Sequence, residues 1–104
     1  MSVIHLVPKD FINQLASSPN HVLIDVREDH EYEDFNLGGI NIPMGDLLSR
    51  IDEVKDYQNL FLCCKSGKRS QAIAFHLKNK MKDKAVYSLD GGLEAYQKTI
   101  NVSV

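Results

Sequence analysis

Short apolar runs alternate with helix-like segments along the whole chain, and this alternation limits the available folds more than any other feature. A short apolar run is long enough for one strand, and the helical segment after it brings the chain back to the edge of the sheet where the next strand begins. The pattern is typical of a mainly parallel sheet covered by helices. We predict strands at 3–6, 22–25, 39–42, 60–63 and 85–87. The length of 104 residues fits a single domain over 1–104.

The segments between the runs carry the signals of helices. Pro8 suits a first helical turn, and the turn-forming residues 17–20 end that helix. Asp46 is a suitable N-cap for the next helix, and the turn at 90–92 precedes the last one. We predict helices through 8–15, 47–51, 70–77 and 93–98, and assign no structure to 99–104.

One of the strand-to-helix turns carries a cysteine among cations. Cys64 follows the apolar run 59–63, and Lys65, Lys68 and Arg69 come before the next helix. Such a turn directs unpaired amide N–H groups and the positive end of the helix dipole at its centre, which favours the thiolate form of a cysteine. We expect a partly exposed nucleophile there. Because the formal net charge of the chain is −2, the positive field is local and favours an anionic substrate.

Charge and composition exclude several classes of function. The chain has 12 Lys and Arg residues against 14 Asp and Glu residues, so it offers no basic stripe for nucleic acid. Neither a signal peptide nor a membrane-spanning stretch is present, and we expect a cytoplasmic protein without membrane contact. The adjacent Cys63 and Cys64 form no disulfide framework. We predict no metal site and no cofactor, since the histidines are scattered at His5, His21, His30 and His76.

Two further segments reach the same edge of the predicted sheet as Cys64. The segment 25–27 follows the second strand, and 90–92 follows the fifth. In open α/β sheets, ligands bind outside the carboxyl ends of the strands. We therefore expect these segments to wall a pocket, with Asp25 and Arg27 as a buried ion pair that supports the loop. We expect Arg69 to pair with Asp25 or with another carboxylate.

Four motifs resemble those of rhodanese-like sulfurtransferases, in the order in which that family has them. They are 23–28, 40–43, Cys64-x-x-Gly67-x-Arg69-Ser70 and 91–96, and together they cover nearly the whole chain. The resemblance implies an α/β fold with a five-stranded, mainly parallel sheet flanked by helices on both faces. It also implies a loop whose cysteine takes up a sulfane sulfur as a persulfide.

The same resemblance assigns roles to the residues of the loop. Cys64 is the expected nucleophile of a thiosulfate sulfurtransferase, and Asp25, Arg27 and Ser70 support the loop. The expected partners are an anionic sulfur donor and a thiol or sulfur-carrier protein as acceptor, with the chain a monomer. The segment 36–39 is similar to that of rhodanese domains that are fused to, or work with, the adenylating enzymes of sulfur-carrier pathways. The residues expected to bind substrate are Lys65, Ser66, Gly67, Lys68 and Arg69.

Two other functions fit parts of the pattern. The spacing from Cys63 to Arg69 is the C-x5-R of cysteine phosphatases, although Ser66 and Leu62 occupy positions where that pattern has Gly and His. A rhodanese-like domain can also be a non-catalytic interaction or regulatory module. Cys63 occupies a position where the family more often has an aliphatic or aromatic residue. It either packs as a small apolar side chain, or resolves the persulfide or senses oxidation.

Overall fold

The centre of the molecule is a sheet of five parallel strands. The computed structural model describes residues 2–102, and all neighbouring strands in it run parallel. The strand order is β1-β5-β4-β2-β3. This confirms the predicted α/β fold, and the sheet is wholly rather than mainly parallel. The strands are β1 (Ile4–Leu6), β2 (His21–Asp25), β3 (Ile40–Asn41), β4 (Asn59–Cys63) and β5 (Ala85–Leu89).

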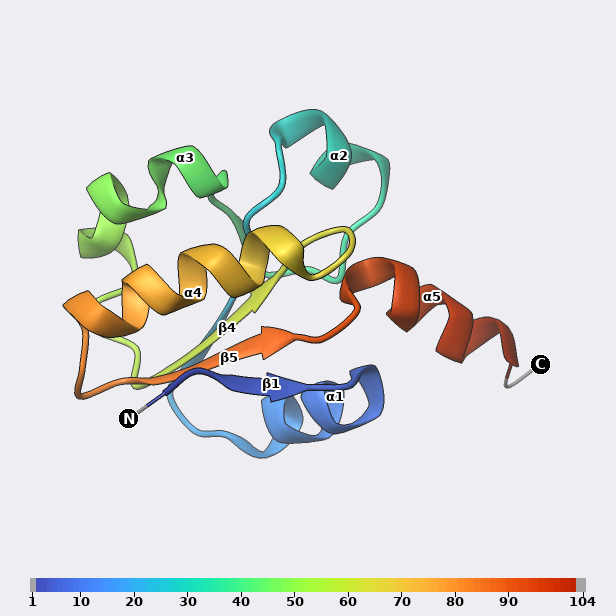
Figure 1. Ribbon diagram of the computed structural model, residues 1–104, viewed down its shortest axis with the longest axis horizontal. Coiled ribbons are helices and arrows are strands. Elements are labelled where there is room, and N and C mark those ends of the chain that lie inside the picture. The colour runs from blue at the N-terminus through green and yellow to red at the C-terminus, as the bar shows by residue number, and fades with distance from the viewer. Residues whose placement is uncertain (1, 103–104) are drawn as a thin grey trace.

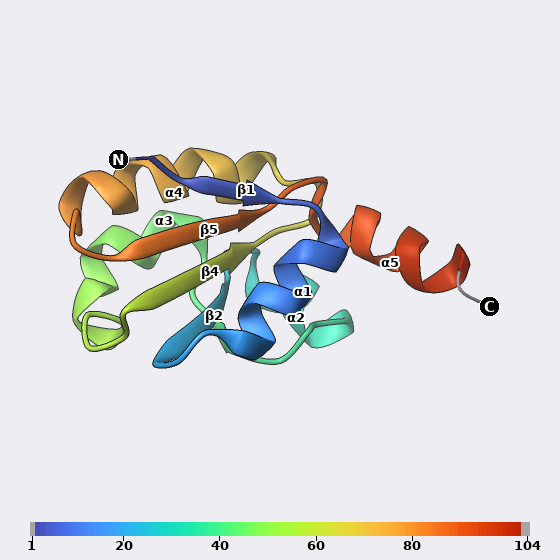
Figure 2. The ribbon, with the colours of Figure 1, turned by 90° about the horizontal axis from the view of Figure 1, so that it is seen from below.

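Helices cover both faces of this sheet (Figures 1 and 2). On one face lie α1 (Pro8–Ser17) and α5 (Gly92–Val102), and α5 extends past the sheet. On the other face lie α3 (Met44–Leu47), the 3-10 helix η1 (Leu48–Glu53) and α4 (Lys68–Lys80). The short helix α2 (Asp29–Asp34) connects β2 to β3.

The pleat of the central strands divides the core into two apolar clusters. Side chains of a strand point alternately to opposite faces, so Leu60 and Leu62 pack beneath α3 and α4, whereas Phe61 packs towards α1. On that second face the rings of Phe61 and Tyr87 are stacked, with centroids 4.3 Å apart. Because both faces are covered, β4 is apolar and buried from Leu60 to Cys63, as is typical of buried parallel strands.

The helices differ from the predicted ones in four places. Helix α2 was not predicted, since its charged sequence has no apolar stripe, and the prediction of Asp46 as an N-cap was wrong because Pro43 caps α3. Helix α4 begins earlier than predicted, at Lys68. Helix α5 continues to Val102, so most of the unassigned segment 99–104 is helical, while 103–104 lie outside the described residues.

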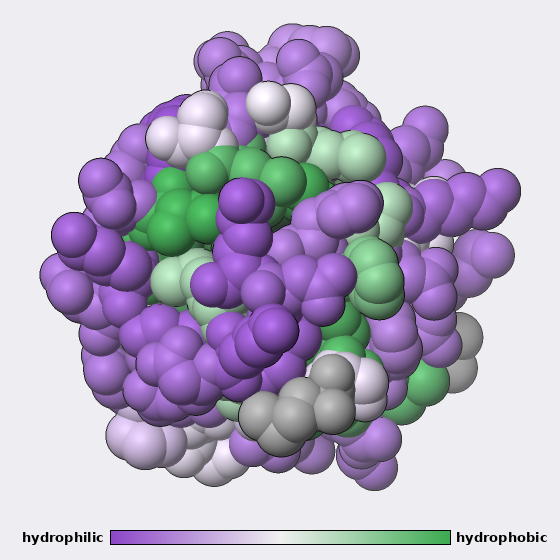
Figure 3. Space-filling model, turned by 60° about the vertical axis from the view of Figure 1, so that its left-hand side comes forward, coloured by the Kyte–Doolittle hydropathy of each residue, from purple (hydrophilic) through white to green (hydrophobic). Residues whose placement is uncertain are grey.

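Hydrophilic side chains predominate on the face drawn in Figure 3, and apolar side chains show between them in several places. Within residues 2–102, no helix has the length and apolar character needed to cross a membrane.

Candidate active site

The sulfur of Cys64 lies at the turn between β4 and α4, where two backbone amides point at it. The N–H of Gly67 donates to Cys64 Sγ at 3.1 Å, and the N–H of Ser70 donates at 3.3 Å. Gly67 is the N-cap of α4, with a left-handed φ of 95° that a residue with a side chain rarely adopts. The positive end of the α4 dipole and two donors therefore converge on one sulfur atom.

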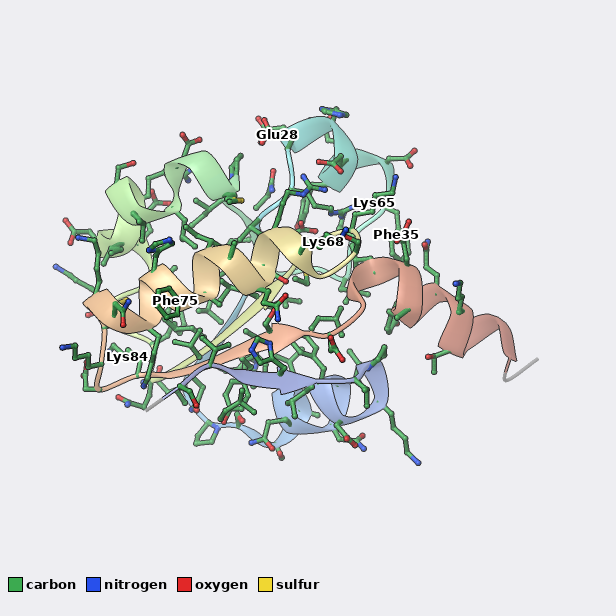
Figure 4. The ribbon with its side chains drawn as sticks, viewed as in Figure 1. Glu28, Phe35, Lys65, Lys68, Phe75 and Lys84 are labelled. Carbon is green, nitrogen blue, oxygen red and sulfur yellow. The ribbon has the colours of Figure 1, made fainter. Side chains whose placement is uncertain are left out.

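The sulfur is covered, which corrects the expectation of a partly exposed nucleophile. Cys64 is 0% exposed, and it packs with Ile73 and Ala74 of α4 in the apolar cluster on that face. The reason is the curl of the loop, which places its amides over the sulfur and its long side chains outside. Lys65 and Lys68 are exposed on that outer side (Figure 4), and no ion pair engages either of them in the described part of the chain.

A serine hydroxyl lies against the sulfur, and a second serine hydroxyl is bonded to the first. Ser70 Oγ is 3.6 Å from Cys64 Sγ and 2.9 Å from Ser88 Oγ, and it donates to the carbonyl oxygen of Gly67 at 3.2 Å. Ser70 is thus hydrogen-bonded to the loop that the resemblance expects it to support. Ser88 was not among the predicted site residues, although a small polar residue inside the apolar strand β5 was a signal for it.

The start of α5 holds the other side of the loop. The N–H of Leu93 donates to the carbonyl oxygen of Cys64 at 2.8 Å, and the N–H of Glu94 donates to that of Lys65 at 3.0 Å. A Cβ on Gly92 would lie 2.3 Å from the Lys65 oxygen. Only glycine permits so close an approach of the two backbones. The turn 90–92 therefore lies against the Cys64 loop, as its place in the sequence predicts.

A buried ion pair lies on the β2 side of the loop. Arg27 and Asp25 are 2.7 Å apart, and their side chains are 7% and 1% exposed. The hydrogen bond to Asp25 raises the pKa of Arg27 above its ordinary value. The N–H of Val26, between them, donates to the carbonyl oxygen of Cys63 at 3.0 Å. The predicted ion pair is confirmed, and its segment is bonded to the strand end that directly precedes Cys64.

Arg69 pairs with Glu31 of α2 and not with Asp25. Both terminal nitrogens of Arg69 donate to the Glu31 carboxylate at 2.8 Å. This pairing lowers the pKa of Glu31 to about 2, chiefly through the hydrogen bond from Arg69. Asp25 was the wrong partner because Arg27 already occupies its carboxylate. The prediction of another carboxylate was right, but Glu31 lies on the helix that the sequence analysis missed.

A groove of about 530 Å³ borders the loop at Lys65. It runs between α2 and α5, and Figure 4 shows Phe35 beside Lys65 at this place. Cys64 itself does not line it. The polar groups of the groove carry both signs of charge, and its lining consists of Arg27, His30, Glu31, Asp34, Phe35, Lys65, Leu93, Glu94 and Gln97.

Cys63 lies on the other side of the sheet from Cys64. It is fully buried in the cluster beneath α1 and α5. Burial raises the pKa of its thiol far above the ordinary value, and the nearby carboxylate of Asp25 raises it further. Both thiols are free, but the amides of the loop converge only on Cys64.

Comparison with known proteins identifies relatives of this chain. The model of the rhodanese-like domain family matches residues 7–99. The chain is 30% identical over 103 residues to the adenylyltransferase and sulfurtransferase MOCS3 of Drosophila persimilis, covering 91% of this chain and 23% of that protein. It is 29% identical over 82 residues to the putative sulfur carrier protein YrkF of Bacillus subtilis, covering 78% of this chain and 44% of the relative. The chain thus spans less than half the length of either relative.

A solved structure shares the fold. The crystal structure of reduced Bacillus anthracis CoADR-RHD superimposes with a TM-score of 0.79 and 28% sequence identity. The match covers 96% of this chain and 17% of that one.

Proposed function

The chain belongs to the rhodanese-like domain family, and from that premise we propose that it is a sulfurtransferase that carries a sulfane sulfur on Cys64. The convergence of the Gly67 and Ser70 amides on Cys64 Sγ is the observation that supports this most directly. Hydrogen bonds to a charged acceptor are stronger than those to a neutral one. These two amides therefore stabilise negative charge that develops on Cys64 Sγ during sulfur transfer.

Thiosulfate is the donor that we propose, because it is a small anion with an electrophilic outer sulfur. The Cys64 thiolate attacks that sulfur, and a new S–S bond forms as the bond to sulfite breaks. Sulfite leaves with the electron pair of the broken bond, and the enzyme keeps a persulfide with its negative charge on the terminal sulfur. Lys65 and Lys68 attract the donor and stabilise the leaving sulfite. Arg69, bonded to Glu31, orders the loop rather than contacting the substrate.

The loop has to move for this reaction to occur. Cys64 is 0% exposed, so neither donor nor acceptor reaches its sulfur while the backbone of 65–67 covers it. The side chains of Lys65 and Ser66 are exposed, so the segment can move without breaking buried contacts of these side chains. We therefore propose that the segment 65–67 moves to expose the sulfur. Hydrogen bonds to α4 and α5 hold this segment at its two ends.

The acceptor in this proposal is a thiol, either of a small molecule or of a sulfur-carrier protein. Its nucleophilic atom attacks the terminal sulfur, and the Cys64 thiolate is the leaving group. The groove beside Lys65, about 530 Å³ in volume, offers charged and apolar contacts to the rest of such an acceptor. Relatives named as a sulfurtransferase and a sulfur carrier support this choice. A reducing cytoplasm is the compartment that we propose, because it keeps both thiols free.

Phosphatase chemistry fits the site less well. The phosphatase spacing makes Cys63 the nucleophile, yet Cys63 points to the opposite face of the sheet and burial raises its pKa. No described amide donates to its sulfur. A purely non-catalytic module would have no use for two amides directed at a cysteine.

The test is the intact mass of the protein after incubation with thiosulfate. We expect a gain of one sulfur atom that cyanide removes as thiocyanate, both in the parent and in Cys63→Ser. Cys64→Ser takes up none. Absence of an adduct on the parent at any thiosulfate concentration would favour a docking module. Hydrolysis of an aryl phosphate that Cys63→Ser abolishes and Cys64→Ser spares would favour the phosphatase.

A further inference from the structure

The hydroxyls of Ser70 and Ser88 form a buried pair beneath the Cys64 sulfur. Ser70 is 0% and Ser88 is 1% exposed, and the two oxygens are 2.9 Å apart. Ser88 lies on β5 and Ser70 on α4, so the pair joins the sheet to the helix that begins at the active-site loop. None of the steps of sulfur transfer proposed above involves Ser88.

The protons of this pair can be assigned from the partners of each oxygen. A serine hydroxyl has one proton and two lone pairs. In the described part of the chain, Ser70 Oγ is the only hydrogen-bond partner of Ser88 Oγ. If Ser70 donated to Ser88, the Ser88 proton would be buried without an acceptor, which is unfavourable. Ser88 is therefore the donor and Ser70 the acceptor.

This assignment leaves the proton of Ser70 with two acceptors. They are the carbonyl oxygen of Gly67 at 3.2 Å and Cys64 Sγ at 3.6 Å. When Cys64 is a thiol, its S–H donates to Ser70, and Ser70 donates to Gly67. When Cys64 is a thiolate, the negative sulfur attracts the Ser70 proton instead. Donation from Ser88 strengthens that bond, because hydrogen bonds in a chain polarise one another.

We propose that Ser88 is a positioning residue that orients the Ser70 hydroxyl as a third hydrogen-bond donor to the charged sulfur of Cys64. This rests on the proposed function in that Cys64 is the reactive thiolate. In a persulfide the charge lies on the terminal sulfur, and it returns to Cys64 Sγ when the acceptor removes that sulfur. Ser88 therefore assists the discharge of the persulfide, in which Cys64 is the leaving group.

The experiment measures the pH profile of Cys64 alkylation by iodoacetamide, followed by mass in a Cys63→Ala background. Ser88→Ala moves the profile to higher pH by about 0.5 to 1 unit, as expected for weakening one hydrogen bond to a charged group. Ser88→Thr keeps the hydroxyl and the parent profile. Ser18→Ala is the matched control, because Ser18 is another buried serine whose hydroxyl is bonded at 2.7 Å, to the carbonyl of Gln14. It leaves the profile unchanged.

A double variant separates this role from a general loss of packing. Ser88 acts through Ser70, so Ser88→Ala in a Ser70→Ala background adds no further shift. An unchanged profile in Ser88→Ala, or an equal shift with and without the Ser70 hydroxyl, overturns the inference. Alkylation needs no sulfur donor, so a failure of thiosulfate to load the protein would count against the proposed function and leave this test readable.

Discussion

Gly92→Ala is expected to distort the Cys64 loop without changing Cys64 itself. The new Cβ would lie 2.3 Å from the carbonyl oxygen of Lys65 and 2.6 Å from the nitrogen of Gly67, whereas ordinary contact begins at 3.4 Å. The loop must therefore retreat by about 1 Å, as this difference requires. That movement breaks the hydrogen bond from Glu94 N–H to Lys65, now 3.0 Å, and the neighbouring one from Leu93 to Cys64, now 2.8 Å.

The expected loss of stability is the sum of these effects. A left-handed φ of 65° at position 92 costs an alanine about 1 kcal/mol. Each lost hydrogen bond costs about 1 kcal/mol more. The free energy of unfolding should therefore fall by about 3 kcal/mol, and Tm by about 12 °C for a domain of this size. Misalignment of the amides should slow persulfide formation at least about tenfold.

Gly38→Ala is the matched control. Gly38 has φ of 89°, and a Cβ there meets nothing within 4 Å. It should lose about 1 kcal/mol, through backbone strain alone, and keep the parent rate of persulfide formation. Urea unfolding and the rate of sulfur uptake from thiosulfate measure both quantities. Equal losses of stability and equal rates in the two variants would refute the claim that contact between Gly92 and the loop positions its amides.

Three further predictions concern the groups around the loop. Arg69→Gln should lower stability by about 1 kcal/mol at neutral pH, and urea unfolding at several pH values checks its acid dependence. Pairing lowers the pKa of Glu31 from 4.5 to about 2. The pair therefore stabilises the fold fully above about pH 4.5, and this stabilisation is lost as the pH falls towards 2. Arg69→Gln should not show this acid-dependent loss of stability. Asp25→Asn leaves the buried Arg27 charge without its partner and should cost about 3–5 kcal/mol in urea unfolding. Cys63→Ala should lose about 1 kcal/mol by removing a buried sulfur, yet keep the parent rate of sulfur uptake.

Each of these three has an outcome that would contradict it. An unfolding curve for Arg69→Gln that weakens in acid as much as the parent would mean that Glu31 is not the titrating group. An Asp25→Asn variant as stable as the parent would show that water or another group compensates Arg27. Loss of sulfur uptake in Cys63→Ala, with the fold intact, would give the second thiol a direct part in the chemistry.

The sequence contained the order of strands and helices because the apolar runs are bounded by clear turn signals. All five strands were predicted within one or two residues of their ends, and the loop at Cys64 follows from the junction of a buried run with an amphipathic helix. Helix α2 could not be found by periodicity, since none of its residues is buried. The sequence feature that marks the start of α2 is the pair Glu28 and Glu31, whose reciprocal hydrogen bonds cap the helix.

Because α2 was not predicted, Glu31 on that helix was not identified as the partner of Arg69. A charged pair between two segments far apart in sequence depends on the tertiary fold, and local pattern gives no means of choosing between carboxylates. Ser88 was missed for a related reason: its place beneath the sulfur depends on the pairing of β5 with β4. The covering of Cys64 depends on how tightly the loop curls, which its glycine permits but does not determine.

The two cysteines are neighbours in sequence but have different surroundings in the fold. At the end of a strand, successive side chains point to opposite faces, so Cys63 packs beneath α1 and α5 while Cys64 packs against α4. Joining the two sulfurs would require one side chain to cross the sheet. It would also break the bonds from the Gly67 and Ser70 amides to Cys64 or that from Val26 to the carbonyl of Cys63. In the proposed reaction, a persulfide on Cys64 would therefore not be resolved by Cys63, and its sulfur would go to an acceptor from outside the chain.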